Sequence, residues 1–159
     1  MTDKDDLARP LLGAGEAATT EARDAVARLV EELQAGWDGD DAEITDRSLA
    51  ADVAWGSPHG STVHGYDRLH AIHVGLKAKR TGGSSSRFEV GRVLAPSPGV
   101  AIAHIRRLAL GPDGQPMEDG GATPDGAFSE MALYVLVQRD GRWWVAAGQN
   151  TPITPGGAA

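Results

Sequence analysis

The segment FSEMALYVLVQRDGRWWVAAGQNT, residues 128–151, decides the fold class of this chain. Its two halves, residues 128–138 and 143–151, are rich in the β-branched and aromatic residues that are typical of strands. Asp140-Gly141 between them is the signal of a tight turn. The segment therefore predicts an antiparallel β-hairpin near the end of the chain.

Other strands are predicted upstream of this hairpin, at residues 53–57, 61–64, 87–94 and 99–110. The first of them ends at Pro58, because proline cannot donate a hydrogen bond to a sheet. Residues 111–127 hold Gly, Pro and Asp at high density and form the connection into the hairpin.

The N-terminal half of the chain has helical periodicity. Apolar residues recur at spacings of three and four, at Val26, Leu29, Val30, Leu33 and Trp37. They predict a helix of about four turns that Thr19 or Thr20 caps and that Gly36 and Gly39 end. A second, shorter helix capped by Asp40 or Asp41 is predicted to carry Ile44 and Leu49. A third helix is predicted from Leu69, Ile72, His73 and Leu76.

This order of elements predicts an α+β fold in which the helices gather at one end of an antiparallel sheet. A long helix fits only the concave face of a curved sheet, and this closure leaves a cavity. The 159 residues suit one domain, at residues 19–152, with a flexible leader at 1–18 and a flexible tail at 153–159. Residues 82–86 are a Gly/Ser linker.

The composition excludes several classes of function. The chain has no cysteine, so disulfides, zinc thiolate sites and cysteine nucleophiles are excluded. The net charge is −7, and the one basic cluster, residues 77–80, suits a helix C-terminus, so we expect no nucleic-acid partner. We expect no membrane association and a cytoplasmic location, because no apolar run is long enough to span a bilayer and the N-terminus does not have the features of a signal peptide.

Four segments together resemble the SgcJ/EcaC group of the SnoaL-like proteins, in the nuclear-transport-factor-two-like superfamily. They are residues 36–41, residues 55–60, His73 and residues 139–144 with their continuation to Thr151. The resemblance covers about residues 20–152. It implies a cone-shaped curved sheet wrapped around the N-terminal helix with two shorter helices, a homodimer formed through the outer sheet, and a place in natural-product biosynthesis such as that of enediynes or other polyketides.

The resemblance has one important departure. Ketosteroid isomerases of the same superfamily carry a general-base aspartate before a Pro-x-Gly sequence, where this chain has Ser57. Their second catalytic carboxyl falls near Tyr134, whose hydroxyl can donate a hydrogen bond to an oxyanion. The isomerase mechanism therefore does not transfer intact. We expect no nucleotide cofactor, because no Gly-x-Gly-x-x-Gly sequence follows a predicted strand.

The candidate catalytic residues are His73, His104 and Tyr134, since a histidine can exchange protons near neutral pH. His73 is predicted to lie on the buried face of its helix, and His104 shares a strand face with Arg106. Each histidine is equally well explained as a core residue with satisfied hydrogen bonds. No metal site is expected, because His70, which is three residues from His73, has no evident partner.

The candidate substrate-binding residues are Trp37, Trp55, Ser57, Arg106, Glu130, Gln149 and Asn150. The two indoles would form a flat wall for an apolar ligand, and the alternative is that both belong to the core. Arg106 and Glu130 either bind the ligand or pair with each other. One of the two terminal amides must face inward.

These residues lead to three hypotheses. The first is a protein that binds an apolar small molecule and catalyses a cyclisation, isomerisation or hydration. The second is a non-catalytic carrier of a reactive molecule, which the absence of an aspartate at position 57 favours. The third is an interaction module whose interior is filled by side chains. A homodimer is also expected from physical reasoning, because Leu133, Val135 and Val137 would leave an apolar patch on the convex face.

Overall fold

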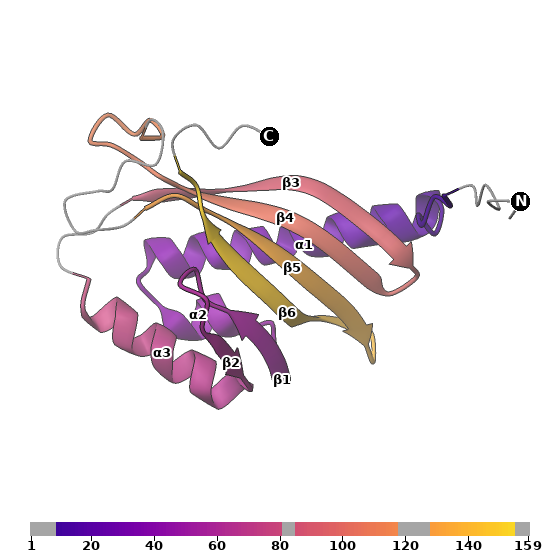
Figure 1. Ribbon diagram of the computed structural model, residues 1–159, viewed down its shortest axis with the longest axis horizontal. Helices are drawn as coiled ribbons and strands as arrows, with labels where there is room; N and C mark the ends of the chain where they lie inside the picture. The colour runs from indigo at the N-terminus through magenta and orange to yellow at the C-terminus, as the bar shows by residue number, and fades with distance from the viewer. Residues whose placement is uncertain (1–8, 81–84, 118–127, 155–159) are drawn as a thin grey trace, which may run out of the picture.

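The computed structural model describes residues 9–80, 85–117 and 128–154 of the chain. A six-stranded sheet curves around one long helix, and two shorter helices lie at one end of it (Figure 1). The predicted α+β class with a curved sheet is therefore confirmed. Parts of four predicted segments lie outside the described residues, namely 1–8 of the leader, 82–84 of the linker, 118–127 of the connection and 155–159 of the tail.

The six strands lie side by side in the order β2-β1-β6-β5-β4-β3. Their bounds are β1 Leu49–Gly56, β2 Thr62–His64, β3 Ser86–Ser97, β4 Val100–Ala109, β5 Glu130–Arg139 and β6 Arg142–Pro152. Neighbouring strands are antiparallel except β1 and β6, which are parallel. The predicted turn between β5 and β6 is confirmed: Asp140 and Gly141 have φ angles of 53° and 75°, as a type I′ turn requires.

Helix α1 (Glu16–Asp38) crosses the concave face of the sheet (Figure 1). Its buried stripe includes Ala22, Val26, Leu29 and Leu33, which form the main core together with the inward residues of β4 and β5. The helix begins one turn earlier than predicted. Gly15 is its N-cap, and the predicted cap Thr19 instead donates its hydroxyl hydrogen bond to the Gly15 carbonyl at 2.8 Å.

The side chain of Gln34 in α1 protects the free edge of β3. Its amide nitrogen donates to the Ser86 carbonyl at 3.0 Å, and its amide oxygen accepts from the Phe88 backbone N–H at 2.9 Å. Both backbone groups belong to an edge strand, whose unpaired N–H and C=O groups would otherwise attract another chain. The helix therefore contacts the sheet through hydrogen bonds as well as through apolar packing.

Helix α2 (Ala42–Asp46) is shorter than predicted, because Leu49 already belongs to β1. The predicted cap is confirmed: Asp41 accepts hydrogen bonds from the backbone N–H groups of Glu43 and Ile44. Among the described residues, no helix has the length and apolar character that crossing a membrane needs.

Helix α3 (Tyr66–Ala78) exposes residues that were predicted to be buried. Ile72 is 39% exposed and Leu76 is 58% exposed, whereas Leu69 is the buried residue of this helix. The prediction assumed that the apolar side of the helix faces the sheet. In the structure the side that carries Leu69, His70, His73 and Lys77 faces inward instead, because these residues meet α1, α2 and β1.

Candidate functional site

The two faces of β4 decide which predicted residues point inward. Ala101, Ala103 and Ile105 are buried against α1, and the residues between them face outward. His104 and Arg106 are therefore exposed on the convex face, so the prediction that they line an internal cavity is wrong. The physical reason is that small alanine side chains allow the long helix to approach the sheet closely on the other face.

Arg107 replaces Arg106 as the inward arginine of β4. Its Nε donates to Glu130 Oε1 at 3.2 Å, and its two terminal nitrogens donate to Ser86 Oγ at 3.1 Å and to the Phe128 carbonyl at 2.8 Å. Arg107 is buried, and its guanidinium is committed to these three partners. Glu130 thus belongs to an ion pair, with a different arginine from the one predicted.

Trp37 does not form an apolar wall together with Trp55. Its ring lies 4.1 Å from the Arg80 guanidinium carbon and 4.3 Å from that of Arg107, and it meets Phe88 edge-on at 6.2 Å. Contacts of this kind between guanidinium groups and an indole are cation–π interactions. The predicted aromatic wall is therefore replaced by a cationic cluster around Trp37.

Lys77 approaches the same cluster. Its ammonium nitrogen lies 5.7 Å from the centre of the Trp37 ring and donates to the Gly36 carbonyl at 2.9 Å. Burial lowers the pKa of Lys77, because an ammonium loses hydration there.

Trp55 lies at the centre of a second inward cluster. Its ring meets Tyr134 at 5.4 Å and His73 at 6.5 Å, both in edge-on geometry. A β-carbon at Gly148 would collide with the indole, so the glycine on β6 is what makes room for it. The sequence prediction placed Trp55 and Tyr134 on inward faces, and both side chains are buried there.

The hydroxyl of Tyr134 makes no hydrogen bond to the part of the chain that the structure describes, although the residue as a whole is buried. Burial raises the pKa of this phenol, so it stays protonated and remains a donor. The Tyr134 oxygen is not fully enclosed, so water or a ligand can reach it and accept this hydrogen bond.

Asp46, at the end of α2, holds both histidines of α3. Its carboxylate is 1% exposed, with Oδ1 2.6 Å from His73 Nδ1 and Oδ2 2.7 Å from His70 Nδ1. An ionised carboxylate only accepts hydrogen bonds, so we assign a proton to Nδ1 of each ring. His73 Nε2, the atom on the other side of its ring, makes no hydrogen bond to any described residue.

His70 is enclosed by acidic groups. Its Nε2 lies 3.0 Å from Glu43 Oε1, and its ring stacks on Tyr66 at 5.2 Å. The hydrogen bond with Asp46, more than any other contact, raises the pKa of His70. The prediction that His70 has no partner is therefore wrong, and the reason is that both of its partners come from α2, far away in the sequence.

Asp46 was not among the predicted site residues. The sequence does contain a signal for it, since Asp46 lies four residues after Ala42 in one short helix and so shares the buried face of that helix. A carboxylate on a buried helix face next to two histidines in space is a candidate for proton chemistry.

The three predicted residues at the ends of β1 and β6 have different surroundings. Ser57 Oγ accepts from the backbone N–H groups of His59 and Ser61, so this hydroxyl closes the turn after β1. Gln149 donates to the Ser57 carbonyl at 3.2 Å and pairs with Leu133 of the outward face. Asn150 pairs with the buried Ala132, so it is the amide that lies on the inward face.

Comparisons with solved structures place this architecture among known folds. An uncharacterised protein with a cystatin-like fold from Caulobacter vibrioides is 21% identical, over 85% of this chain and 92% of that one, with a TM-score of 0.63. An NTF2-like protein of unknown function from Pseudomonas putida KT2440 is 17% identical, over 87% of this chain and 89% of that one, with a TM-score of 0.64. This chain has the nuclear-transport-factor-two-like cone fold.

A ketosteroid isomerase-like protein from Erwinia carotovora atroseptica has the same NTF2-like fold. It is 14% identical, over 83% of this chain and 96% of that one, with a TM-score of 0.62. No protein-family model matches the chain, and no curated protein has significant sequence similarity to it. Likeness at this level of identity concerns the fold, so the function has to be argued from the residues.

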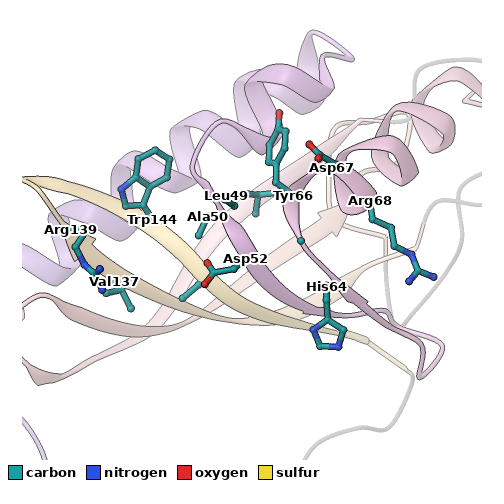
Figure 2. Close-up of a pocket in the computed structure, with 13 residues that line it drawn as sticks. Leu49, Ala50, Asp52, His64, Tyr66, Asp67, Arg68, Val137, Arg139 and Trp144 are labelled. Atoms are coloured by element: carbon teal, nitrogen blue, oxygen red, sulfur yellow. The ribbon is translucent and has the colours of Figure 1, made fainter.

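A groove of about 830 Å³ lies on the outward side of the NTF2-like sheet. Figure 2 shows Trp144 and Arg139 on one side of it, His64 and Arg68 on the other, and Asp52 between them. Two smaller grooves, of about 420 and 200 Å³, lie between α2 and α3 and between α1 and the β5–β6 turn. Trp55, His73 and Tyr134 line none of these three grooves, so the predicted internal cavity is not among them.

Proposed function

We propose that the protein binds an apolar small molecule between α3 and the concave face of the sheet and catalyses a proton-transfer step on it. The observation that carries this proposal is a pair of polar atoms on two rings that both meet Trp55, neither of which makes a hydrogen bond to a described residue. His73 Nε2 is a bare acceptor that Asp46 holds in place, and the Tyr134 hydroxyl is a donor. A base and a donor beside an indole suit a flat substrate that carries an oxygen atom.

Each residue of this site has a role in the proposed step. His73 Nε2 removes a proton from the substrate, and Asp46 keeps the ring in the tautomer that leaves this nitrogen free. Tyr134 donates to the substrate oxygen on which negative charge develops. The same pair would serve an isomerisation, a cyclisation or a hydration, since each of these needs a base at one atom and a donor at another.

A role in the biosynthesis of enediynes or other polyketides is the biological setting that we propose. It is supported by the resemblance of four sequence segments to the SgcJ/EcaC group. A ketosteroid isomerase-like protein shares this fold, which is compatible with a protein that binds a small molecule.

A non-catalytic carrier is the second candidate function. The turn after β1 favours it, because Ser57 occupies the place of a general-base aspartate and uses its hydroxyl to close the turn. In that case His73 and Tyr134 would bind the ligand by hydrogen bonds without transferring a proton.

We also propose that the protein is a homodimer that associates through the convex face of the sheet. Leu133, Val135 and Val137 alternate along the outward side of β5 and are only half-buried in the isolated chain. Light scattering after size exclusion should give twice the chain mass of 16.6 kDa for the parent. Val135→Lys should give a monomer, while Gln138→Lys, at an exposed position on the same strand, should remain a dimer.

The catalytic proposal can be tested with a panel of aromatic polyketides that includes emodin. Binding to the folded state raises the melting temperature, so at least one compound should stabilise the parent. That compound should be converted by the parent, converted much more slowly by Tyr134→Phe and left unchanged by His73→Gln. Binding without conversion would establish the carrier. No stabilisation by any member of the panel would contradict both functions.

A further inference from the structure

We propose that His70 and His73 share one positive charge across Asp46, so that a proton gained by His73 is matched by a proton released from His70 through Glu43. His70, Asp46 and Glu43 are then positioning residues: they act on the reaction through His73 and not by touching the substrate. This inference rests on the proposed function for its catalytic meaning, but the charge sharing itself can be measured without any substrate.

A continuous series of short contacts connects the inward cluster to the surface. It runs from His73 Nδ1 to Asp46 Oδ1 (2.6 Å), from Asp46 Oδ2 to His70 Nδ1 (2.7 Å), and from His70 Nε2 to Glu43 Oε1 (3.0 Å). The exposed fraction of the side chain is 1% at Asp46 and 77% at Glu43. The series therefore begins beside Trp55 and ends in water.

The two rings differ in how many acidic partners they have. His70 has a carboxylate oxygen at each of its nitrogens, and this geometry suits an imidazolium, which donates from both. His73 has a carboxylate at Nδ1 only, so it can remain neutral with Nε2 free. The resting state therefore has the positive charge on His70.

A single buried carboxylate does not balance two imidazolium rings. Asp46 carries one negative charge and lies between the two rings, so a second positive charge beside it would repel the first. The charge of Glu43 offsets little of this repulsion, because its side chain is 77% exposed and water screens it. The two rings are therefore a coupled pair whose protons are taken up in separate steps.

The other charged and titratable groups around the two rings favour a single positive charge, located on His70. On the His70 side, Glu43, Asp67 and Tyr66 lie close enough to interact electrostatically. On the inward side, Lys77 interacts with Asp46, and its positive charge adds to the cost of a second imidazolium. Tyr134 also lies within the field of Asp46, and its neutral phenol leaves the charge balance unchanged.

In the proposed step, every proton that the two rings gain is matched by one that they release. His73 Nε2 takes one proton from the substrate, and its Nδ1–H stays on the ring and donates to Asp46. His70 gives its Nε2 proton to Glu43 or to water beside it, and its Nδ1–H stays on the ring and donates to Asp46. The positive charge moves from one ring to the other, and the net charge of the two rings with Asp46 is the same before and after the step. Return of a proton to the product reverses both transfers.

Nitrogen-15 NMR of the imidazole rings tests this inference on the full chain without substrate. The spectrum distinguishes a ring with one proton from a ring with two, and the exposed His59, His64 and His104 serve as internal references. In the parent, a pair that holds one positive charge should show two ring protons on His70 and one on His73. In the His70→Gln variant, the share of His73 rings that carry two protons at a given pH should be larger than in the parent.

Glu43→Gln is the second variant. It replaces an exposed side chain, so we expect the variant to fold like the parent. It should make His70 lose its second proton at a lower pH than in the parent, while Glu31→Gln, an exposed substitution in α1, should have no effect. The inference is overturned if His73 in His70→Gln titrates as in the parent, or if Glu43→Gln leaves His70 unchanged. Either result leaves the proposed function standing. If instead the parent converts no compound of the polyketide panel, the catalytic proposal is overturned and the charge sharing is not.

Discussion

Helices α1 and α3 both lie against the sheet, but they use their side chains in opposite ways. In α1 the apolar stripe faces inward, and Leu29 is only 4% exposed. In α3 the apolar residues Ile72 and Leu76 face outward, and the inward side carries His73 and Lys77. The first helix contributes burial of apolar surface, and the second contributes polar groups to the interior.

The difference indicates which helix is built for stability and which for function. Burial of apolar surface is the main favourable term in folding, so a helix that leaves Ile72 and Leu76 outside contributes less of it. Polar groups at inward positions cost free energy unless they are paired, and in α3 they are held by Asp46, Glu43 and the Gly36 carbonyl. Departures from the simple inside–outside pattern of this kind are expected at functional sites.

The largest effect should come from the core side of α1. Leu29→Ala removes a buried side chain and leaves a cavity, so the free energy of unfolding should fall by about 3 to 4 kcal/mol. Urea unfolding followed by tryptophan fluorescence measures it. A loss below about 1 kcal/mol would mean that α1 is not the main source of apolar burial.

The next largest effect should come from the group that holds α3. Asp46→Asn keeps the shape of the side chain but removes the charge that two histidines contact, so stability should fall by about 2 to 3 kcal/mol near neutral pH. The same urea experiment measures it, with Asp52→Asn on the outward face as the control. Equal stability of the two variants would contradict the role of Asp46.

A pH-dependent effect should distinguish α3 from α1. Because the hydrogen bond with Asp46 raises the folded-state pKa of His70 above its ordinary value, this residue stabilises the fold fully at pH values below about 6.5. The contribution is lost as the pH rises through the folded-state pKa. Unfolding at about pH 5.5 should therefore separate the parent from His70→Gln more than unfolding at about pH 9 does.

The control for this pH effect is His64→Gln, which changes an exposed ring on β2. It should alter stability by the same small amount at both pH values. A difference between the parent and His70→Gln that grows toward alkaline pH would reverse the predicted sign.

The smallest effect should come from the outward side of α3. Leu76→Ser replaces a side chain that is largely in water, so the free energy of unfolding should change by less than about 0.5 kcal/mol. A loss comparable to that of Leu29→Ala would show that the outward side of α3 is covered in solution, and the contrast between the two helices would then disappear.

The sequence patterns predicted the elements well and the inward side chains less well. The β5–β6 hairpin and the order of strands follow from local residue preferences and from Asp140-Gly141. For α3 the periodicity was correct, and Leu69 and His73 face inward as predicted, whereas Ile72 and Leu76 face outward. On β4 the alternation was correct, but His104 and Arg106 are on the outward face.

What the sequence determined is the set of helices and strands, the α+β class and the faces of β5, because these depend on neighbours within a few residues along the chain. Only the tertiary structure decided that α2 and α3 meet through Asp46, that Arg107 rather than Arg106 turns inward, and that Ser57 closes a turn. Asp46 and His73 are 27 residues apart in the chain, and their contact depends on how two helices dock on the sheet. Docking is set by the shape of the whole core, which no local pattern contains.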